Sequence, residues 1–323
     1  MNTKKINIAV WSVGQHAIRN ILPVLARSSY INLYGVYTRN REVMRSKAEE
    51  YKCIAFTDET SFLLNDDVDA VYISSPNSLH YEQIKASLLH NKHVIVEKTA
   101  LINTLQFDEL IEVARRKKLL LMEAFMFRFH RQWQILKDLV VTEKYGRVLS
   151  ADISFGFPHL NKEDIRYQRD LDGGALNDAG AYTICAARNL FGDDINLIGS
   201  SVMSLDEYEV DTIGVASFIS AATSATVNCK WVFGGSYLSE IKVWCEKAHI
   251  TVERAFAKPS DLYSLIKIHN NGELIEEISC GKDNHFIHMF SHFRDEIINN
   301  SFENEYQQLG NQLSIMEKIR GNI

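Results

Sequence analysis

Several features are scarce in this chain of 323 residues, and each scarcity excludes a class of protein. Only 4 prolines occur and 46% of the residues are hydrophobic, which excludes a proline-rich or disordered chain. No apolar run reaches the roughly 18 residues that a membrane-spanning helix needs. Basic residues are in the minority, since 35 Lys and Arg stand against 41 Asp and Glu. We therefore expect a globular protein with neither a nucleic-acid nor a membrane partner.

The cysteines lack any pairing pattern. They stand at Cys53, Cys185, Cys229, Cys245 and Cys280. An odd number of widely spaced cysteines without a CxxC pair is typical of reduced thiols and not of a disulfide framework. The first residues lead within a few positions into a strand-like run. We therefore expect a cytoplasmic protein.

The hydrophobic pattern changes in character between about residues 125 and 145. Before this point, short apolar runs alternate with amphipathic helical stretches such as 81–90 and 104–117. The apolar runs lie at 6–11, 31–37, 69–73, 93–96 and 119–123. This alternation predicts an α/β domain with a doubly wound parallel sheet. Because the chain exceeds the usual size of one core, we expect two domains, at 1–125 and 126–323, with a junction helix at about 126–142.

The second domain has longer segments in which apolar and polar residues alternate. They lie at 148–157, 211–219, 224–233, 239–245 and 262–269. Such alternation predicts mostly antiparallel strands with one face in water. Helical patterns at about 174–190 and 286–299 complete this domain, which we expect to be of the α+β class.

The run at 93–96 ends in the charged pair Glu97-Lys98. Open α/β sheets bind their ligands outside the carboxyl ends of the strands, so a lysine here is a candidate ligand-binding residue. A strand that simply emerges into solvent would also acquire charges. The pair alone therefore leaves both readings open.

The first run leads into a turn that suits a dinucleotide. A pyrophosphate site at a helix N-terminus needs small residues, so that main-chain N–H groups approach the phosphates. Ser12 stands where the first glycine is usual, Gly14 fills the second place and Ala17 the third. Gln15 and His16 lie between them, and we include both among the candidate cofactor residues.

The end of the second run, Thr38-Arg39, lacks the carboxylate that would bind the ribose hydroxyls of NAD(H). Arginine here pairs with a 2′-phosphate and stacks on adenine, which predicts NADP(H) as the preferred cofactor and NAD(H) as the weaker one. A solvated basic turn is the alternative. Farther on, Ser75-Pro76-Asn77 and His80 follow the run at 69–73 and would line the nicotinamide half of the cleft, although ordinary loop chemistry also explains them.

In the second domain, Asp178 and Tyr182 are four residues apart, on one face of the helix expected after Gly173-Gly174. A tyrosine packed in the core and an aspartate placed for the helix dipole are the structural alternatives. Arg128 and His130, near the domain junction, would reach the substrate or hold the junction. Histidines 285, 288 and 292 share a helix face, but they are poorly matched as zinc ligands, so we expect no metal.

In this order the segments resemble the Gfo/Idh/MocA oxidoreductase family over essentially the whole chain. The matching segments are 12–17, 75–77 with His80, 97–98, 122–130 and 173–182. The resemblance implies an N-terminal Rossmann domain and a C-terminal domain built on a large, open, mostly antiparallel sheet. It also implies hydride exchange between a nicotinamide and a carbohydrate-like substrate, in a homodimer or homotetramer associated through that sheet.

The resemblance also implies roles for single residues. Lys98 matches the family's active-site lysine, Asp178 its substrate-contacting aspartate, and Tyr182 a position held by histidine or tyrosine. The tyrosine form is similar to the branch of sugar ketoreductases, glucose-fructose oxidoreductase and dimeric dihydrodiol dehydrogenase. Arg166, followed by Tyr167-Gln168, resembles sugar 3-ketoreductases of deoxysugar pathways. Two departures stand out, because Ser12 replaces a glycine and Thr99 replaces the proline that usually follows the lysine.

These residues suggest a mechanism. Tyrosine has a pKa of about 10, and a nearby ammonium lowers it, so we expect Tyr182 to exchange the proton and Lys98 to tune it. Asp178 would bind a neighbouring hydroxyl. We therefore predict an NADP(H)-dependent oxidoreductase of a sugar, with a nucleotide-linked keto sugar preferred. The alternatives are a dehydrogenase of a free aldose or trans-dihydrodiol, and a non-catalytic NADPH-binding sensor.

Overall fold

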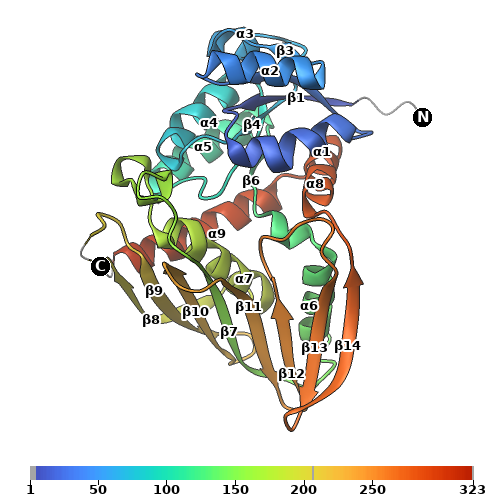
Figure 1. Cartoon of the computed structure of the whole chain (residues 1–323), viewed down its shortest axis with the longest axis vertical. Coiled ribbons are helices and arrows are strands. Elements are labelled where there is room, and N and C mark those ends of the chain that lie inside the picture. Colours follow the sequence, from blue (N-terminus) through green and yellow to red (C-terminus); the bar gives the residue numbers. More distant parts are fainter. Residues whose placement is uncertain (1–4, 206, 322–323) are drawn as a thin grey trace. The chain divides into compact units, whose positions relative to one another are not determined.

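A computed structural model describes residues 5–205 and 207–321 (Figure 1). The chain forms two compact units. The first takes in the residues up to Ala124 together with Phe286–Gly310, and the second takes in Phe125–His285 and the residues from Asn311 onward. The boundary after residue 125 stays a prediction. The two compact units do not follow a single boundary in the sequence, because Phe286–Gly310 packs with the first unit.

The first unit contains a sheet of six strands in the order β3-β2-β1-β4-β5-β6, and each pair is parallel. The strands are β1 (Ile6–Trp11), β2 (Ile31–Tyr37), β3 (Ile54–Ala55), β4 (Ala70–Ile73), β5 (His93–Val96) and β6 (Leu121–Glu123). All four residues of β4 are buried, as expected for a central strand covered on both faces. The doubly wound parallel sheet is confirmed.

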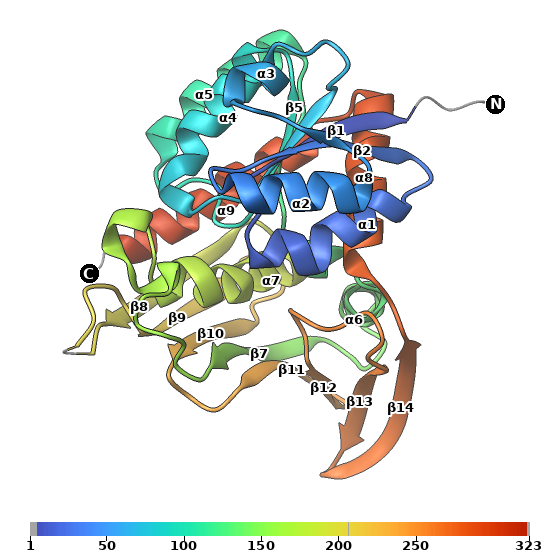
Figure 2. The same ribbon diagram turned by 45° about the horizontal axis from the view of Figure 1, so that its top comes forward.

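Helices cover both faces of this sheet, with α1 and α2 on one side and α4 and α5 on the other (Figure 2). Asn40, Asp58 and Asn103 accept main-chain N–H groups and so start α2, α3 and α5. The helices are α1 (Leu22–Arg27), α2 (Arg41–Tyr51), α3 (Glu59–Leu63), α4 (His80–Leu89), α5 (Thr104–Lys117), α8 (His285–Asn299) and α9 (Glu303–Arg320), whose second half belongs to the other unit.

The second unit contains a sheet of eight strands in the order β14-β13-β12-β11-β7-β10-β9-β8. Only the pairing of β10 with β7 is parallel among the described residues. The strands are β7 (Val148–Phe157), β8 (Ile195–Met203), β9 (Ile213–Ser220), β10 (Thr226–Phe233), β11 (Leu238–Cys245), β12 (His249–Glu253), β13 (Ser264–Asn270) and β14 (Glu273–Gly281). The expected large, mostly antiparallel sheet is confirmed.

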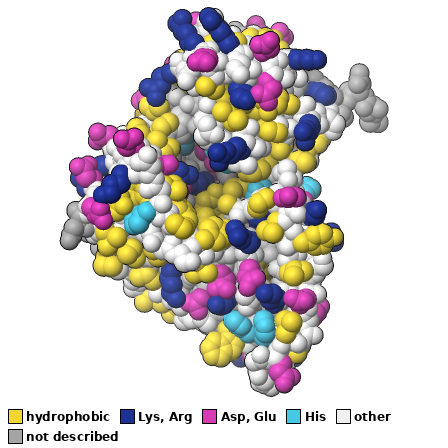
Figure 3. Space-filling model, in the orientation of Figure 1, with side chains coloured by type: hydrophobic (Ala, Val, Ile, Leu, Met, Phe, Trp, Pro, Cys, Tyr) yellow, Lys and Arg dark blue, Asp and Glu magenta, His cyan; other side chains and the backbone are white. Residues whose placement is uncertain are grey.

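One face of this sheet packs against α6 (Arg131–Val141) and α7 (Ala181–Phe191). Residues of alternate position, such as Ile153, Trp231 and Ile241, point into this core and are fully buried. The other face lies in water. Acidic, basic and histidine side chains gather there, together with large apolar ones (Figure 3). The expectation of one wet face is confirmed.

The structure adds elements that the pattern did not predict, among them the two-residue strand β3 and the elements β8, β12, β14 and α9. β8 and β14 are the edge strands of the sheet, and most of their residues are at least partly exposed on both faces. Edge strands therefore lack the alternation on which the prediction depended. β12 has only 5 residues, too few for a reliable period.

Candidate active site

The turn after β1 forms despite its missing glycine. Ser12 has a φ of 78°, a value that non-glycine residues adopt uncommonly, and its N–H donates to Tyr37 O over 2.8 Å. A Cβ added to Gly14 would meet nothing within 4 Å, so the space above the turn is open. Ile18 N donates to Gly14 O over 3.0 Å and opens the helix that continues through a π-helical turn, Ala17–Ile21. Strand β1, this turn and the helix therefore follow one another directly, with open space at Gly14.

Thr38 and Arg39 follow β2 directly, as expected. Arg39 is exposed, and the next residue, Asn40, accepts the N–H groups of Glu42 and Val43 over 3.1 Å. This cap starts α2 immediately after the arginine, so the position of Arg39 at the carboxyl edge of the sheet is well defined. No carboxylate lies between Tyr37 and Asn40.

The side chain of Glu97 is tied into the first unit by two neighbours. His16 Nε2 lies 3.0 Å from Glu97 Oε1, and the Tyr72 hydroxyl donates to the same oxygen. Burial alone would raise the pKa of Glu97, but His16, the Tyr72 hydroxyl and Lys98 outweigh it and lower the pKa to about 2. Glu97 is therefore a carboxylate that joins the end of β5 to the helix after β1.

The backbone around Lys98 is held from two sides. The Lys98–Thr99 peptide is cis, and Thr99 is buried. Ala100 N donates to Glu123 Oε1 over 2.9 Å, so the end of β6 supports the loop that follows the lysine. His80 Nδ1 lies 2.9 Å from Thr99 O on its other side. Lys98 itself is partly exposed at the end of β5.

His80, one of the candidate cofactor residues, is held inside the first unit, and its contact with a cofactor stays a prediction. Its side chain is 0% exposed, and its two ring nitrogens face main-chain oxygens, Thr99 O at 2.9 Å and Ser75 O at 3.0 Å. Burial lowers its pKa, whereas these carbonyl groups oppose that change. His80 therefore joins the loops after β4 and β5 and acts on the site through the backbone.

Ser75, Pro76 and Asn77 lie between β4 and α4, at the carboxyl edge of the sheet. Ser75 Oγ donates to Gln83 Oε1 over 2.5 Å, which anchors this loop to the second turn of α4. Asn77 begins the short 3₁₀-helix Asn77–Leu79 and is partly exposed. The first unit thus places all of the candidate cofactor residues along one edge of its sheet.

In the second unit, Asp178 and Tyr182 share one continuous helix. Its first turn, Leu176–Gly180, is π-helical, and α7 continues from Ala181. A Cβ on Gly180 would lie 2.9 Å from the Trp231 ring, so the glycine allows the helix to approach β10 closely. π-helical turns within helices often occur at functional sites.

Tyr182 lies among aromatic side chains and is 6% exposed. Its hydroxyl is 3.4 Å from Met126 Sδ. Four phenyl rings surround it with centroid distances of 5.3 to 5.9 Å, those of Phe125, Phe127, Phe155 and Phe256. Charge is costly in such surroundings unless an opposite charge is close.

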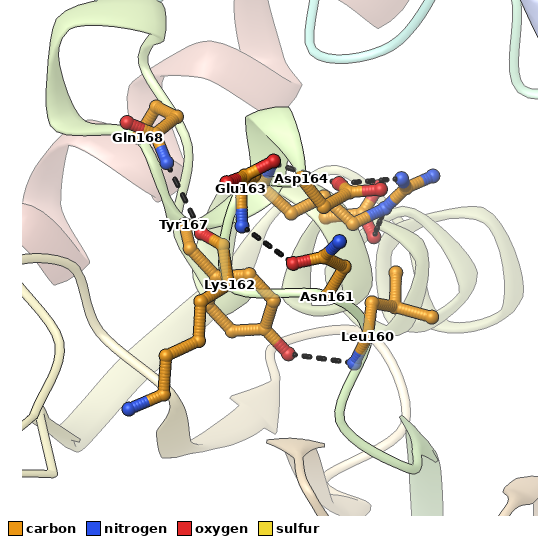
Figure 4. A network of polar contacts seen from close by, with 9 residues as sticks. Leu160, Asn161, Lys162, Glu163, Asp164, Tyr167 and Gln168 are labelled. Atoms are coloured by element: carbon orange, nitrogen blue, oxygen red, sulfur yellow. Dashed lines mark hydrogen bonds and ion pairs between the residues drawn. The ribbon is translucent and has the colours of Figure 1, made fainter.

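Asp178 forms an ion pair with Arg166, which was predicted separately as a substrate residue. Arg166 Nε donates to Asp178 Oδ2 over 2.8 Å, and Arg166 Nη1 donates to Asp164 Oδ1 over 3.0 Å. The two carboxylates raise the pKa of Arg166, Asp178 first. The loop that carries this arginine is held by its own bonds, including Tyr167 Oη accepting from Leu160 N (Figure 4).

Of the two junction residues, His130 is the more buried. Its side chain is 1% exposed, and His130 Nδ1 accepts from Gln132 N over 3.0 Å, which caps α6. This bond fits the structural alternative, and a contact of His130 with the substrate stays a prediction. Arg128 is partly exposed, with its guanidinium 5.3 Å from the centroid of the Phe129 ring.

Among residues 5–205 and 207–321, no group of three or more His, Cys, Asp or Glu side chains is arranged to hold a metal. Two of the three histidines considered for this role have identified neighbours. His285 packs against His130, and His292 Nε2 lies 3.0 Å from Glu305 Oε1. No described helix is long and apolar enough to cross a membrane.

Sequence reasoning did not identify four residues that hold the site. They are Gln83, Glu123, Asp164 and Asp211. Two of them carried a signal, because Glu123 ends an apolar run as Glu97 does and Asp164 stands two residues before Arg166. Gln83 and Asp211 carried none, since their partners are fixed only by the fold.

Both halves of the chain match known protein families. Residues 6–125 match the family described as "Oxidoreductase family, NAD-binding Rossmann fold", and residues 133–251 match the "GFO/IDH/MocA C-terminal domain". Together these matches cover most of the chain.

Individual relatives add detail. A dTDP-3,4-didehydro-2,6-dideoxy-alpha-D-glucose 3-reductase from Saccharopolyspora spinosa is 30% identical over 276 residues, which are 85% of this chain and 82% of the relative. A D-xylose 1-dehydrogenase (NADP(+)) from Haloferax volcanii is 29% identical over 211 residues, 64% of each chain. The crystal structure of a 3-ketoreductase from Actinomadura kijaniata in complex with NADP and TDP-benzene has a TM-score of 0.93 and 26% identity, covering 99% of this chain and 98% of that one.

Proposed function

This chain belongs to the Gfo/Idh/MocA family of oxidoreductases, and we propose that it is an NADP(H)-dependent reductase of a nucleotide-linked keto sugar. Membership confirms the resemblance seen in the sequence. The dTDP-keto-sugar 3-reductase and the TDP-bound 3-ketoreductase support the substrate class. The observation that carries the proposal is that Asp178, paired with Arg166, lies one turn before Tyr182 on the same helix. This spacing suits a carboxylate that binds a sugar hydroxyl beside a proton carrier.

The first unit supports NADP(H) as the cofactor. Exposed Arg39 suits a 2′-phosphate, and the open space above Gly14 suits a pyrophosphate at the start of the helix. Bound there, the nicotinamide supplies the hydride in reduction and accepts it in oxidation. The remaining candidates, from Ser75 to Lys98, lie farther along the same edge and would meet the nicotinamide half. The proposal includes no metal.

The proton is assigned to Tyr182. In reduction the phenol donates it to the carbonyl oxygen as hydride reaches the carbon, and in oxidation the phenolate takes it back. The apolar rings around Tyr182 make a phenolate costly unless a cation accompanies it, and Lys98 is proposed to supply that ammonium and to bond the reacting oxygen. Asp178, oriented by Arg166, binds a neighbouring sugar hydroxyl.

Oxidation of a free aldose is the second candidate function, and the D-xylose 1-dehydrogenase relative favours it. Both reactions use the same proton carrier and cofactor, so the difference lies in what else the substrate carries. A nucleotide-linked sugar needs a contact for its diphosphate, and partly exposed Arg128 is a cation in the second unit that would serve it.

For assembly, we propose a homodimer or homotetramer formed through the wet face of the eight-stranded sheet. Trp244 is 64% exposed on this face and is paired with His249 on the next strand. Basic Lys230 and Lys242 are interspersed there with acidic Asp152 and Glu240, a pattern that a second copy can match. The five cysteines are free, four of them buried, which supports a reducing compartment and hence the cytoplasm.

A substrate screen tests the proposed function. We would measure NADPH and NADH binding by fluorescence and then follow NADPH oxidation with dTDP-linked keto sugars, and NADP⁺ reduction with free aldoses. We expect NADPH to bind at least about 10-fold more tightly than NADH, and the dTDP-linked substrates to react fastest. Tight NADH binding without NADPH binding would overturn the cofactor assignment. Turnover of free aldoses alone would establish the second candidate.

A further inference from the structure

The connection between β8 and β9 packs along the loop that carries Arg166. Within residues 207–212 of this connection, Glu207 pairs with Lys162, and the Tyr208 ring stacks on Tyr167 with a centroid distance of 4.8 Å. The connection therefore contacts the loop of Arg166 at two places, Lys162 and Tyr167. It lies far from that loop in the sequence.

Asp211 lies two residues before β9 in this connection. It bonds to the first turn of the helix that carries Asp178 and Tyr182. Leu176 N donates to Asp211 Oδ2 over 2.6 Å, and Ala175 N donates to Asp211 O over 2.8 Å. Gly174 has a φ of 108°, and a Cβ there would lie only 2.2 Å from Asp211 Oδ1. The carboxylate thus occupies the space that glycine leaves and serves the main-chain donors at the helix N-terminus.

The same two glycines are held from the opposite direction by Arg166. Gly174 N donates to Arg166 O over 2.8 Å, and a Cβ on Gly173 would lie 2.5 Å from that oxygen. The Gly173-Gly174 turn is therefore enclosed between the backbone of Arg166 and the side chain of Asp211. Asp178 and Tyr182 follow on the helix that begins at this turn.

We propose that Asp211 is a positioning residue that sets the helix carrying Asp178 and Tyr182 in register with Arg166. It does so without touching the substrate. Its catalytic consequence depends on the proposed function, because it acts through the proton carrier and the hydroxyl-binding carboxylate. Its structural consequence does not, since the placement of the Tyr182 ring is measurable without turnover.

The charge of Asp211 gives this role a measurable signature. Burial raises its pKa to about 6, against the opposing effects of the Leu176 N–H, the Trp231 indole and Arg320 of α9. Asp172, just before the glycines, is a second carboxyl whose pKa burial raises, also opposed by Arg320. Because the charged carboxylate is the stronger acceptor, protonation of Asp211 loosens its bond to Leu176 N.

The structural test is an NMR titration of the protein labelled with [¹³C]tyrosine, with the Tyr182 signal assigned through Y182F. We expect the signal of the wild type to shift with a midpoint near pH 6, and the signal of D211N to lose this transition while D172N keeps it. A transition that persists in D211N at the same midpoint would overturn the proposal. This result does not require a substrate, so it stands apart from any failure of the proposed function.

The kinetic test compares kcat, KM and NADPH affinity in D211N and D211A. We expect kcat/KM for the keto sugar to fall about 10-fold to 100-fold in D211A and less in D211N, with NADPH binding unchanged. D69N is the matched control, because Asp69 Oδ2 likewise accepts a main-chain N–H, that of Asn7 over 2.8 Å, at the other edge of the first sheet. Wild-type kcat and KM in both Asp211 variants would overturn the proposal. If D211A fails to fold, D211N still decides.

Discussion

The two units surround their central side chains in opposite ways. In the first, Glu97 is a carboxylate whose pKa is lowered to about 2, held by His16 and the Tyr72 hydroxyl. In the second, Tyr182 lies among four phenyl rings, and its hydroxyl faces a thioether. A charge held by polar partners stays ionised, whereas an apolar setting suits a proton donor that stays neutral until it reacts. The first unit thus holds a fixed charge, and the second holds a neutral hydroxyl.

Both units nevertheless position their key residues by the same means, namely a side chain that binds the backbone. His80 and Glu123 bond the main chain around Lys98, and Asp211 bonds the main chain that starts the helix of Tyr182. Such bonds fix the direction of a neighbouring side chain without occupying the space where a ligand binds. A change at any of them should therefore alter turnover more than cofactor affinity.

The largest effect on activity should follow from removing the hydroxyl of Tyr182. We expect Y182F to lower kcat about 100-fold to 10,000-fold, because the proton carrier is lost, while NADPH affinity stays within twofold. Steady-state kinetics and NADPH fluorescence measure the two effects. Y145F is the matched control, since the Tyr145 hydroxyl bonds an exposed glutamate, Glu276, instead. Undiminished turnover in Y182F would refute the assignment of the proton to this residue.

The next largest effect should follow from removing the partner of Asp178. We expect R166M to raise the KM for the keto sugar and to lower kcat/KM about 10-fold to 100-fold, because the carboxylate loses the guanidinium that orients it. NADPH affinity should not change, since Arg166 belongs to the second unit. R147M, at an exposed pair with Glu246, serves as the control. An equal loss in both variants would contradict the role of Arg166.

Much of the fold could be predicted from the sequence because its signals are local. The apolar runs of β1, β2, β4 and β5 and the alternation in β7 and β10 reflect burial on two faces or one, which the chain shows directly. The edge strands β8 and β14 were not predicted because neither of their faces is fully buried. Helix α9 was not predicted either. Its buried apolar residues are divided between the two units.

The site could be predicted only in part, for a related reason. The spacing of Asp178 and Tyr182 on one helix is a local feature and was visible. The burial of His80 and His130 depends on contacts between distant segments, so the sequence pattern did not show it. Asp211 lies 35 residues from Leu176, and nothing in the chain announces that pairing.

The lowered pKa of Glu97 predicts that the stability of the folded chain depends on pH. Its pKa is lower in the folded chain, about 2, than the 4.5 of a free glutamate, so its contribution is present above pH 4.5 and is lost as the pH falls toward 2. We expect E97Q to reduce the free energy of unfolding by about 3 kcal/mol at neutral pH, and by less as the pH falls below 4.5. Urea unfolding at several pH values measures this.

The control for E97Q is E109Q, which breaks an exposed cluster with Lys85 and Tyr81. Water screens that cluster, so E109Q should change the free energy of unfolding much less. If the two variants lost equal stability, the low pKa of Glu97 would not reflect a buried network. A loss in E97Q that grew as the pH fell would contradict the sign of the shift.

The smallest expected effect concerns Ser12, where the first unit departs from the usual glycine. A side chain at a φ of 78° costs about 1 kcal/mol, and glycine would relieve it while losing a similar amount in chain entropy. We therefore expect S12G to change the free energy of unfolding by less than about 1 kcal/mol and to leave NADPH affinity within twofold. K118G, at a φ of 55° at the end of α5, should change the free energy of unfolding by a similarly small amount. A large loss of NADPH affinity in S12G alone would show that the Ser12 hydroxyl binds the cofactor, and that polar contacts in the first unit extend to its phosphate turn.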